Sequence, residues 1–282
     1  MKKIIAGLLG LLLLAGVGAF FIFGDDDDGG PGNFEGKLRV GMECDYVPYN
    51  WQEEKASDTN VPLANRIGLY AEGYDVQMAK AIAEQMGVEM EIDKVPWNTL
   101  LPALKDKQID VIISGMADTA ERMALPDFSA SKTYNVNVAE YCVILRKDSR
   151  YLEASTLVDF YNARLIGQKG TRLDAVIDQI PGVKHLPPIE TFSQMLEYIE
   201  SGKADAGVMD LESAESAVKG HSDLAIVRLA RGQGFALGFT GICVWTRKED
   251  KALLKAVNKA LSNISTESRQ QLLELVRSKV GA

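Results

Sequence analysis

The stretch that decides the fold reads YDVQMAKAIAEQMGVEMEI over residues 74–92. Its apolar residues from Tyr74 to Met86 recur at the spacing of a helix with one buried face. Gly87 follows directly, and glycine readily takes the left-handed conformation that ends a helix. Residues 88–92 then indicate a strand. The stretch therefore predicts a helix, its C-cap and the next strand.

Matching elements lie on both sides of this stretch. We expect a short apolar strand at 38–42 followed by a polar loop, a short helix at 100–107 and a buried strand at 109–114. The resulting order is β-α-β-α-β, which favours a largely parallel sheet. In such sheets, ligands bind at the carboxyl ends of the strands.

The alternation of strands and helices then starts again. Strands are expected at 138–145, 165–168, 184–186 and 206–209, with helices at 172–179, 191–201 and 211–219. A further apolar strand at 241–246 and a long amphipathic helical region at 250–275 follow. Because that region needs a lobe to pack against, the second unit is predicted to be an insertion into the first.

The predicted fold class is thus α/β with two lobes, each a mostly parallel sheet flanked by helices. Lobe 1 comprises residues 37–139 and 240–282, and lobe 2 comprises residues 140–239. The chain is expected to cross between the lobes near 139–141 and again near 239–241. Two crossings form a hinge, with a cleft between the lobes.

The N-terminus has the charge order of an exported protein. Two lysines precede an uncharged apolar run at 4–23, and the acidic cluster 25–28 follows it. Residues 1–24 are therefore expected to be a signal peptide or a membrane anchor, and the length of the run favours the anchor. Residues 25–36, rich in aspartate and glycine, predict a solvated tether. The basic side stays in the cytoplasm, so the bulk of the chain lies outside it.

The net charge argues against nucleic acid as a partner, and the cysteine spacing argues against a structural metal site. The net charge of −8, with a pI near 5.0, disfavours nucleic acid as a partner. The three cysteines, Cys44, Cys142 and Cys243, form no CxxC pair, so neither a structural metal nor a cofactor is expected. Cys142 and Cys243 lie in apolar runs and are expected to be buried, with a disulfide between them left open.

The sequence contains none of the common catalytic motifs. It contains no Gly-x-Ser-x-Gly elbow, no His-Glu-x-x-His helix and no Walker A loop. The two histidines, His185 and His221, are expected to lie on the solvent side or at strand ends. An enzyme is therefore not expected.

A series of short motifs resembles the polar amino-acid binding proteins of ABC importers, which are solute-binding proteins of family 3. The motifs, in chain order, are 41–51 (GMECDYVPYNW), 72–75 (EGYD), 96–97 (PW), 109–111 (IDV), 114–116 (SGM), 119–122 (TAER), 204–206 (ADA) and 246–250 (TRKED). Each is weak alone, but the ordered set is specific and covers residues 38–280. The resemblance implies the type II periplasmic-binding fold and a receptor that hands its ligand to a membrane permease with a separate ATPase.

The resemblance also implies how the ligand backbone would be held. Arg122 matches the arginine that pairs with the ligand α-carboxylate, for which a planar guanidinium is the right shape. Thr171, in the turn 169–172, would hold the same carboxylate through backbone N–H groups. Asp210 matches the carboxylate that receives the α-ammonium, although it is also a good N-cap for the next helix. The backbone carbonyls of Ser114 and Gly115 could face that ammonium.

The side-chain end of the ligand is less defined. Tyr46 and Trp97 match aromatic walls, and Ala117 stands where many relatives have a serine that contacts the ammonium. Glu43 matches an acidic position that pairs with the distal cation of arginine, lysine or ornithine. Arg172 stands where a small hydroxyl residue is common. If it turned into the cleft it would favour glutamate or glutamine instead, whereas on a first helical turn it can face solvent.

The preferred interpretation is a receptor for a cationic amino acid that works by hinge closure. Glu43 and other acidic residues near it, among them Asp45, would make the mouth of the cleft acidic, and that favours a cation. A dehydratase on the same fold and a ligand-sensing domain remain as alternatives. The amino-acid cradle argues against the first, and the lack of an output domain after Val280 argues against the second.

Overall fold

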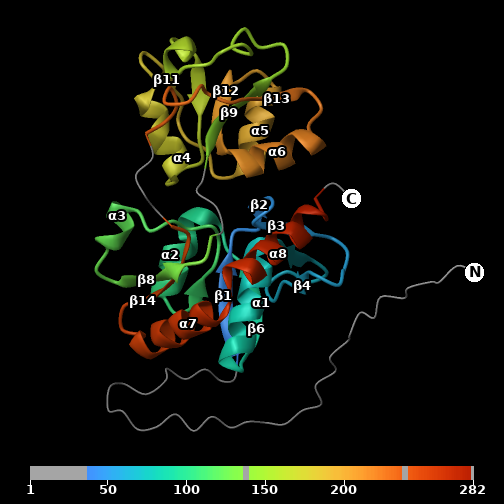
Figure 1. Ribbon diagram of the computed structural model, residues 1–282, viewed down its shortest axis with the longest axis vertical. Coiled ribbons are helices and arrows are strands. Elements are labelled where there is room, and N and C mark those ends of the chain that lie inside the picture. The colour runs from blue at the N-terminus through green and yellow to red at the C-terminus, as the bar shows by residue number, and fades with distance from the viewer. Residues whose placement is uncertain (1–36, 136–139, 237–240, 281–282) are drawn as a thin grey trace, which may run out of the picture.

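The computed structural model describes residues 37–135, 140–236 and 241–280, which form two lobes (Figure 1). The sheet of lobe 1 has the strand order β6-β1-β7-β14-β8. Its strands are β1 (Lys37–Met42), β6 (Glu89–Lys94), β7 (Val111–Ile112), β8 (Phe128–Thr133) and β14 (Cys243–Arg247). β6, β1 and β7 are parallel, whereas β14 runs antiparallel to both of its neighbours.

Lobe 2 repeats this topology with the strand order β11-β10-β12-β9-β13. Its strands are β9 (Tyr141–Arg146), β10 (Arg164–Ile166), β11 (Lys184–His185), β12 (Ala206–Asp210) and β13 (Leu224–Val227). Here β9 is the reversed strand. The two reversed strands, β9 and β14, are the first described strands after the gaps at 136–139 and 237–240. Each sheet is therefore mixed, and the sequence did not predict β8, β13 or the reversals.

A third, antiparallel sheet lies where the sequence predicted only a polar loop. It has the order β2-β3-β5-β4 and consists of β2 (Asp45–Tyr46), β3 (Asn50–Glu53), β4 (Val61–Pro62) and β5 (Tyr70–Glu72). Strands as short as two residues carry too few side chains to show a period of two. This small sheet holds Tyr46 at the edge of lobe 1 that faces lobe 2.

The structure has a helix in each region where the periodicity predicted one, and it adds the short helix α3 (Ala120–Met123). The other helices are α1 (Tyr74–Met86), α2 (Leu100–Lys105), α4 (Arg172–Ala175), α5 (Phe192–Glu200), α6 (Leu211–Gly220), α7 (Lys251–Asn263) and α8 (Thr266–Arg277). Three short 3₁₀ turns add η1 (Trp97–Thr99), η2 (Leu157–Phe160) and η3 (Val176–Gln179). α1 ends at Gly87 in the left-handed conformation, with φ 67°, as predicted.

The C-terminal helical region is two helices rather than one. α7 ends before Ile264, which is in an extended conformation, and Ser265 caps α8 by accepting a hydrogen bond from the backbone N of Ser268 at 3.1 Å. Serine is a favoured N-cap residue, so Ser265 begins a new helix at the start of the polar run 265–271. α7 packs against α1 and thereby joins the C-terminal part of the chain to lobe 1.

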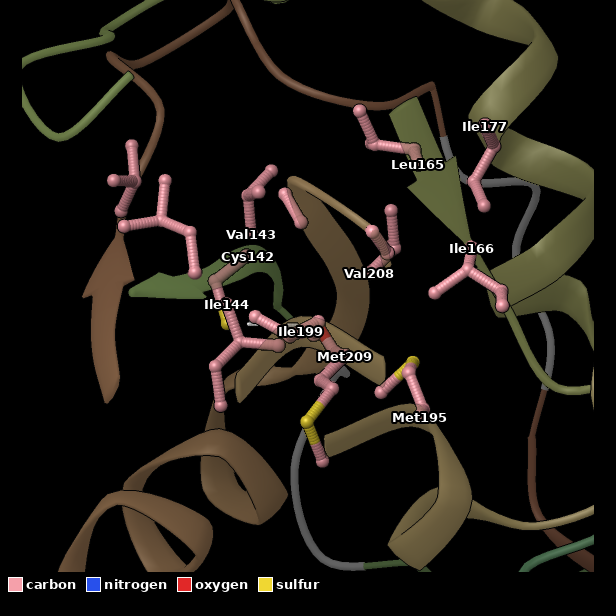
Figure 2. Packing of buried hydrophobic residues seen from close by; sticks show 14 of the residues in the cluster. Cys142, Val143, Ile144, Leu165, Ile166, Ile177, Met195, Ile199, Val208 and Met209 are labelled. Atoms are coloured by element: carbon pink, nitrogen blue, oxygen red, sulfur yellow. Dashed lines mark hydrogen bonds between the residues drawn. The ribbon is translucent and has the colours of Figure 1, made fainter. Parts of the chain in front are cut away.

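Each lobe has its own apolar core. In lobe 2, side chains from β9, β10 and β12 point toward those of α5 and η3 (Figure 2). Cys142 lies in this core and Cys243 lies in a core of lobe 1. Both are buried and free, so the disulfide that the sequence left open is not formed. Burial raises the pKa of both thiols.

The N-terminal segment expected at 1–24 and the tether expected at 25–36 lie outside the described residues, as do residues 139, 239 and 240 of the two expected crossings. Across the three described ranges, no helix has both the length and the apolar character needed to cross a membrane.

Candidate functional site

The two lobes touch through direct hydrogen bonds between polar side chains. Asn98 Nδ2 of lobe 1 donates to Glu190 Oε2 of lobe 2 at 2.7 Å, and Ser193 N of lobe 2 donates to Asp45 Oδ2 at 3.1 Å. Arg277, in α8, pairs with Glu212 of α6 at 2.5 Å. The structure therefore has the lobes closed on one another.

A cavity of about 300 Å³ lies between the lobes. It is lined by five of the predicted site residues: Tyr46, Gly115, Ala117, Arg172 and Asp210. The other five do not line this cavity. Glu43 and Arg122 form hydrogen bonds across the lobes, whereas Trp97, Ser114 and Thr171 contact residues of their own lobes.

Asp210 combines the two roles that the sequence left open. It is the N-cap of α6, where Oδ1 accepts a hydrogen bond from Ser213 N at 3.0 Å. Its other oxygen, Oδ2, accepts from the Tyr46 hydroxyl of lobe 1 at 2.6 Å. The side chain is buried, and this burial raises its pKa although both hydrogen bonds act in the opposite direction. Asp210 has no ion pair among the residues that the structure describes, and a buried carboxylate in this state favours a positively charged ligand group.

The Tyr46 ring is stacked between one aromatic ring of each lobe. It stacks on Tyr49 of lobe 1 at 4.8 Å and on Phe192 of lobe 2 at 4.9 Å between centroids. Gly115 passes close beneath it, because a Cβ there would lie 2.8 Å from Tyr46 Cε1, and its φ of +62° also favours glycine. The predicted aromatic wall and the predicted carbonyl loop are therefore in contact.

A buried carboxylate that the sequence did not single out fixes both of these loops. Asp75, the second residue of α1, accepts hydrogen bonds from the Tyr134 hydroxyl at 2.8 Å and from Asn50 Nδ2 at 2.7 Å. Tyr134 Oη in turn accepts from Gly115 N at 3.3 Å, and Asn50 Oδ1 accepts from Cys44 N at 2.8 Å. Burial raises the pKa of Asp75 to about 7. Asp75 thus positions the loops that carry Tyr46 and Gly115.

Arg122 lies at the junction of the two lobes. Thr119 caps α3, and the Arg122 guanidinium donates to the Ala117 carbonyl and, across the lobes, to the Gly170 carbonyl, each at 3.0 Å. It also lies over the Trp97 ring at 5.2 Å from the centroid. Burial and the nearby charge of Arg172 lower its pKa to about 10. The structure thus brings together Arg122, Ala117, Trp97 and the turn before α4.

The turn before α4 is rigid and carries Arg172 toward the cavity. Thr171 caps α4 by accepting from Asp174 N at 3.2 Å, and its hydroxyl donates to the Gln168 carbonyl at 2.7 Å. Arg172 lies along the cavity with its guanidinium carbon 5.8 Å from the centroid of the Tyr141 ring. Although Arg172 lies on the first turn of a helix, its side chain therefore lies at the cleft.

Glu43 is buried rather than placed at an open mouth. Its backbone N donates to Ser114 Oγ at 3.0 Å, and its carboxylate accepts a hydrogen bond from Gln168 Nε2 of lobe 2. Burial and the charge of Asp45 raise its pKa to about 8, against the opposing effects of Gln168 and Lys94. The pairing of Glu43 with the distal cation of a ligand stays a prediction, and the structure places this side chain in a buried contact between the lobes.

The site also contains residues to which the sequence assigned no ligand role. Tyr49, Tyr74 and Tyr141 line the cavity, and Gln168 joins Glu43 across the lobes. The one sequence signal for Gln168 is its place two residues after β10, directly before the turn at 169–172.

Two lobes of matching topology that enclose a polar cavity define a two-lobed solute-binding protein. The family model "Bacterial extracellular solute-binding proteins, family 3" matches residues 38–274, and the chain belongs to this family. The resemblance and the fold class expected from the sequence are therefore confirmed. The family consists of binding receptors, so the chain is not an enzyme.

Individual relatives cover most of the chain. The arginine-binding extracellular protein ArtP of Bacillus subtilis is 29% identical over 250 residues, which are 84% of each chain. The L-cystine-binding protein TcyJ of Escherichia coli is 25% identical over 276 residues, 96% of this chain and 93% of the relative. The arginine-bound form of truncated ArgBP from T. maritima is 30% identical, with a TM-score of 0.67 and coverage of 82% and 97%.

Proposed function

We propose that this protein is an extracytoplasmic receptor that captures a cationic amino acid by closure of its lobes and delivers it to an ABC permease. The observation that carries the proposal is that each lobe brings one charged side chain to the contact between the lobes, an arginine from lobe 1 and an aspartate from lobe 2. Arg122 of lobe 1 lies against the turn before α4, and the buried Asp210 of lobe 2 lies against Tyr46. These are complementary to the α-carboxylate and the α-ammonium of an amino acid. The arginine-binding relatives support the same class of ligand.

Each predicted residue then has a defined part. Arg122 and the backbone N–H groups near Thr171 bind the α-carboxylate, and Asp210 binds the α-ammonium in place of the Tyr46 hydroxyl. Tyr46 and Trp97 flank the ligand, and Gly115 offers its carbonyl. Because these groups belong to both lobes, only a bound ligand satisfies all of them, and it selects the closed form.

A second ligand class has one observation in its favour. Arg172 lies along the cavity, where its guanidinium is suited to the side chain of glutamate or glutamine. Glu43, buried and without an ion pair among the described side chains, favours a cation such as arginine, lysine or ornithine. The cationic ligand is proposed because burial makes the ionised form of Glu43 costly unless a cation binds beside it.

The proposal includes attachment to the outer face of the cytoplasmic membrane through residues 1–24. Its support is the order of charges in the sequence, in which Lys2 and Lys3 come before the apolar run and 25–28 come after it.

A thermal-shift screen of the full-length chain against the twenty amino acids, ornithine and citrulline tests the function. A ligand at a thousandfold excess over its Kd is expected to stabilise the protein by about 4 kcal/mol. A response to arginine, lysine or ornithine alone supports the cationic class. A response to glutamate or glutamine alone would transfer the specificity role to Arg172, and no response to any amino acid would overturn the function.

Binding of a cationic ligand is also expected to depend on pH through Glu43. Its pKa of about 8 between the closed lobes means that much of it is protonated there at neutral pH. A cation binds the ionised form, so binding releases a proton. Affinity is then expected to fall about fivefold from pH 8 to pH 7 and about tenfold for the next unit.

Isothermal titration calorimetry in buffers of different ionisation enthalpy measures both the affinity and the released proton. Glu43→Gln is the matched variant, because it keeps the shape of the side chain and cannot titrate. It should bind more weakly at pH 8 and show a flat profile. A wild-type affinity that is constant between pH 6 and pH 8 would contradict the role of Glu43.

A further inference from the structure

Gln168 is held in a fixed position where the two lobes meet. It follows β10, and its carbonyl accepts hydrogen bonds from the Thr171 hydroxyl at 2.7 Å and from Thr171 N at 3.2 Å. The residue is 1% exposed, although glutamine is usually found at the surface. A buried amide with a fixed backbone has few orientations open to it, so its side chain presents its two polar atoms in set directions.

The two polar atoms of this amide are in different situations. Nε2 donates to the Glu43 carboxylate of lobe 1 and to the Glu190 carbonyl of lobe 2, the latter at 2.9 Å. Both of its hydrogens are therefore used. Oε1 is buried and has no hydrogen-bond partner among the described residues. A buried carbonyl oxygen left without a donor is costly, and few occur in native proteins.

Among the described residues, no positive charge is in contact with Glu43 in the same small region. Glu43 is 4% exposed, and Asp45 adds a like charge beside it. Lys94 is the cation that acts on it, but the Lys94 ammonium donates instead to Gln52 Oε1 at 3.0 Å and to the Cys44 carbonyl at 3.5 Å. The region thus contains one carboxylate without an ion pair and one carbonyl oxygen without a donor. A cation that carries several N–H groups would supply both the positive charge for the carboxylate and the donor for the carbonyl oxygen.

We propose that Gln168 is a specificity-determining residue that, together with Glu43, makes the site select a guanidinium over a primary ammonium. This rests on the proposed function, in which the ligand is a cationic amino acid. A guanidinium that enters between the lobes takes over the donation to Glu43 and gives a further N–H to Gln168 Oε1. Its five donors lie in one plane and reach acceptors that belong to opposite lobes.

An ammonium group fits this region less well. It is a compact and strongly hydrated charge, and entering a region where both acceptors are almost fully buried removes its water. A guanidinium is more weakly hydrated and has its donors spread over three nitrogens. The acceptor on Gln168 therefore adds to the binding of arginine more than to that of lysine.

The test compares the affinities of L-arginine and L-lysine for the full-length chain by isothermal titration calorimetry. The wild type is expected to bind arginine at least about tenfold more tightly than lysine, which is the worth of one hydrogen bond to a charged group. Gln168→Met keeps the length of the side chain and removes the amide. It is expected to lose about tenfold or more for arginine and less than about threefold for lysine, so that most of the discrimination disappears.

Controls separate this role from a structural one. Gln85→Met changes an exposed glutamine of α1 and should leave both affinities unchanged. Gln168→Asn moves the same amide back by one methylene and should also reduce the preference for arginine, which keeps the test open if Gln168→Met does not fold. Equal losses for both ligands, or a wild type without preference for arginine, would overturn the role of Gln168 while the cationic function stands. A wild type that binds neither arginine nor lysine would overturn the function itself.

Discussion

Replacing Arg122 with alanine is expected to remove detectable amino-acid binding while the protein stays folded. The guanidinium is the group that we propose for the α-carboxylate, and each hydrogen bond to a charged group contributes about 1.5–3 kcal/mol. Two such bonds correspond to a loss of affinity between about 100-fold and about 10,000-fold. In the unliganded protein its hydrogen bonds run to two backbone carbonyls, those of Ala117 and Gly170, so the lobes keep their cores without it.

Two further variants make this result specific. Arg122→Lys keeps the charge and loses the planar pair of donors, so it should bind more weakly than the wild type but better than Arg122→Ala. Arg66→Ala removes an exposed arginine of lobe 1 and should leave the affinity unchanged. Calorimetry gives the affinities, and circular dichroism with thermal melting confirms the fold. An Arg122→Ala protein with wild-type affinity would refute the carboxylate role.

The fold could be predicted from the sequence where elements are long and periodic. The helix at 74–86 was placed at its observed bounds, because thirteen residues carry several turns of the apolar pattern and Gly87 marks the end. The small sheet of β2 to β5 could not be predicted, because its strands are two to four residues long. The break at Ser265 was missed although residues 265–271 carry no apolar side chain, because a polar run between two apolar helical segments does not by itself show where one helix ends and the next begins.

The sequence indicated candidate site residues within each lobe, but it did not indicate which of them come into contact across the lobes. Asp210 and Arg122 were chosen because the motifs around them resemble those of the family, and their residue types suit the roles that the resemblance implies. The contact between Glu43 and Gln168 joins residues 125 positions apart in different lobes, and no local spacing encodes it. Asp75 was missed as a site-positioning residue because a carboxylate on the first turn of a helix is ordinarily explained by the helix dipole.

The other large effect is expected from Asp210→Asn. Asparagine caps a helix about as well as aspartate, so α6 keeps its cap to the Ser213 N–H and the stability should change by less than about 1 kcal/mol. The α-ammonium of the ligand, in contrast, loses its counter-charge in a buried position. Breaking a buried ion pair by removing one partner costs about 3–5 kcal/mol, which corresponds to an affinity loss of at least about 100-fold.

The comparison that isolates this effect is with Asp148→Asn, which neutralises an exposed aspartate of lobe 2 and leaves the net charge equal to that of Asp210→Asn. The Asp148 variant should bind like the wild type. Asp210→Ala removes both the charge and the cap, so it should lose binding and also unfold at a lower denaturant concentration. If Asp210→Asn bound the ligand as tightly as Asp148→Asn, the carboxylate would serve only as a helix cap, and the ammonium would have to be held by neutral groups such as the Gly115 carbonyl.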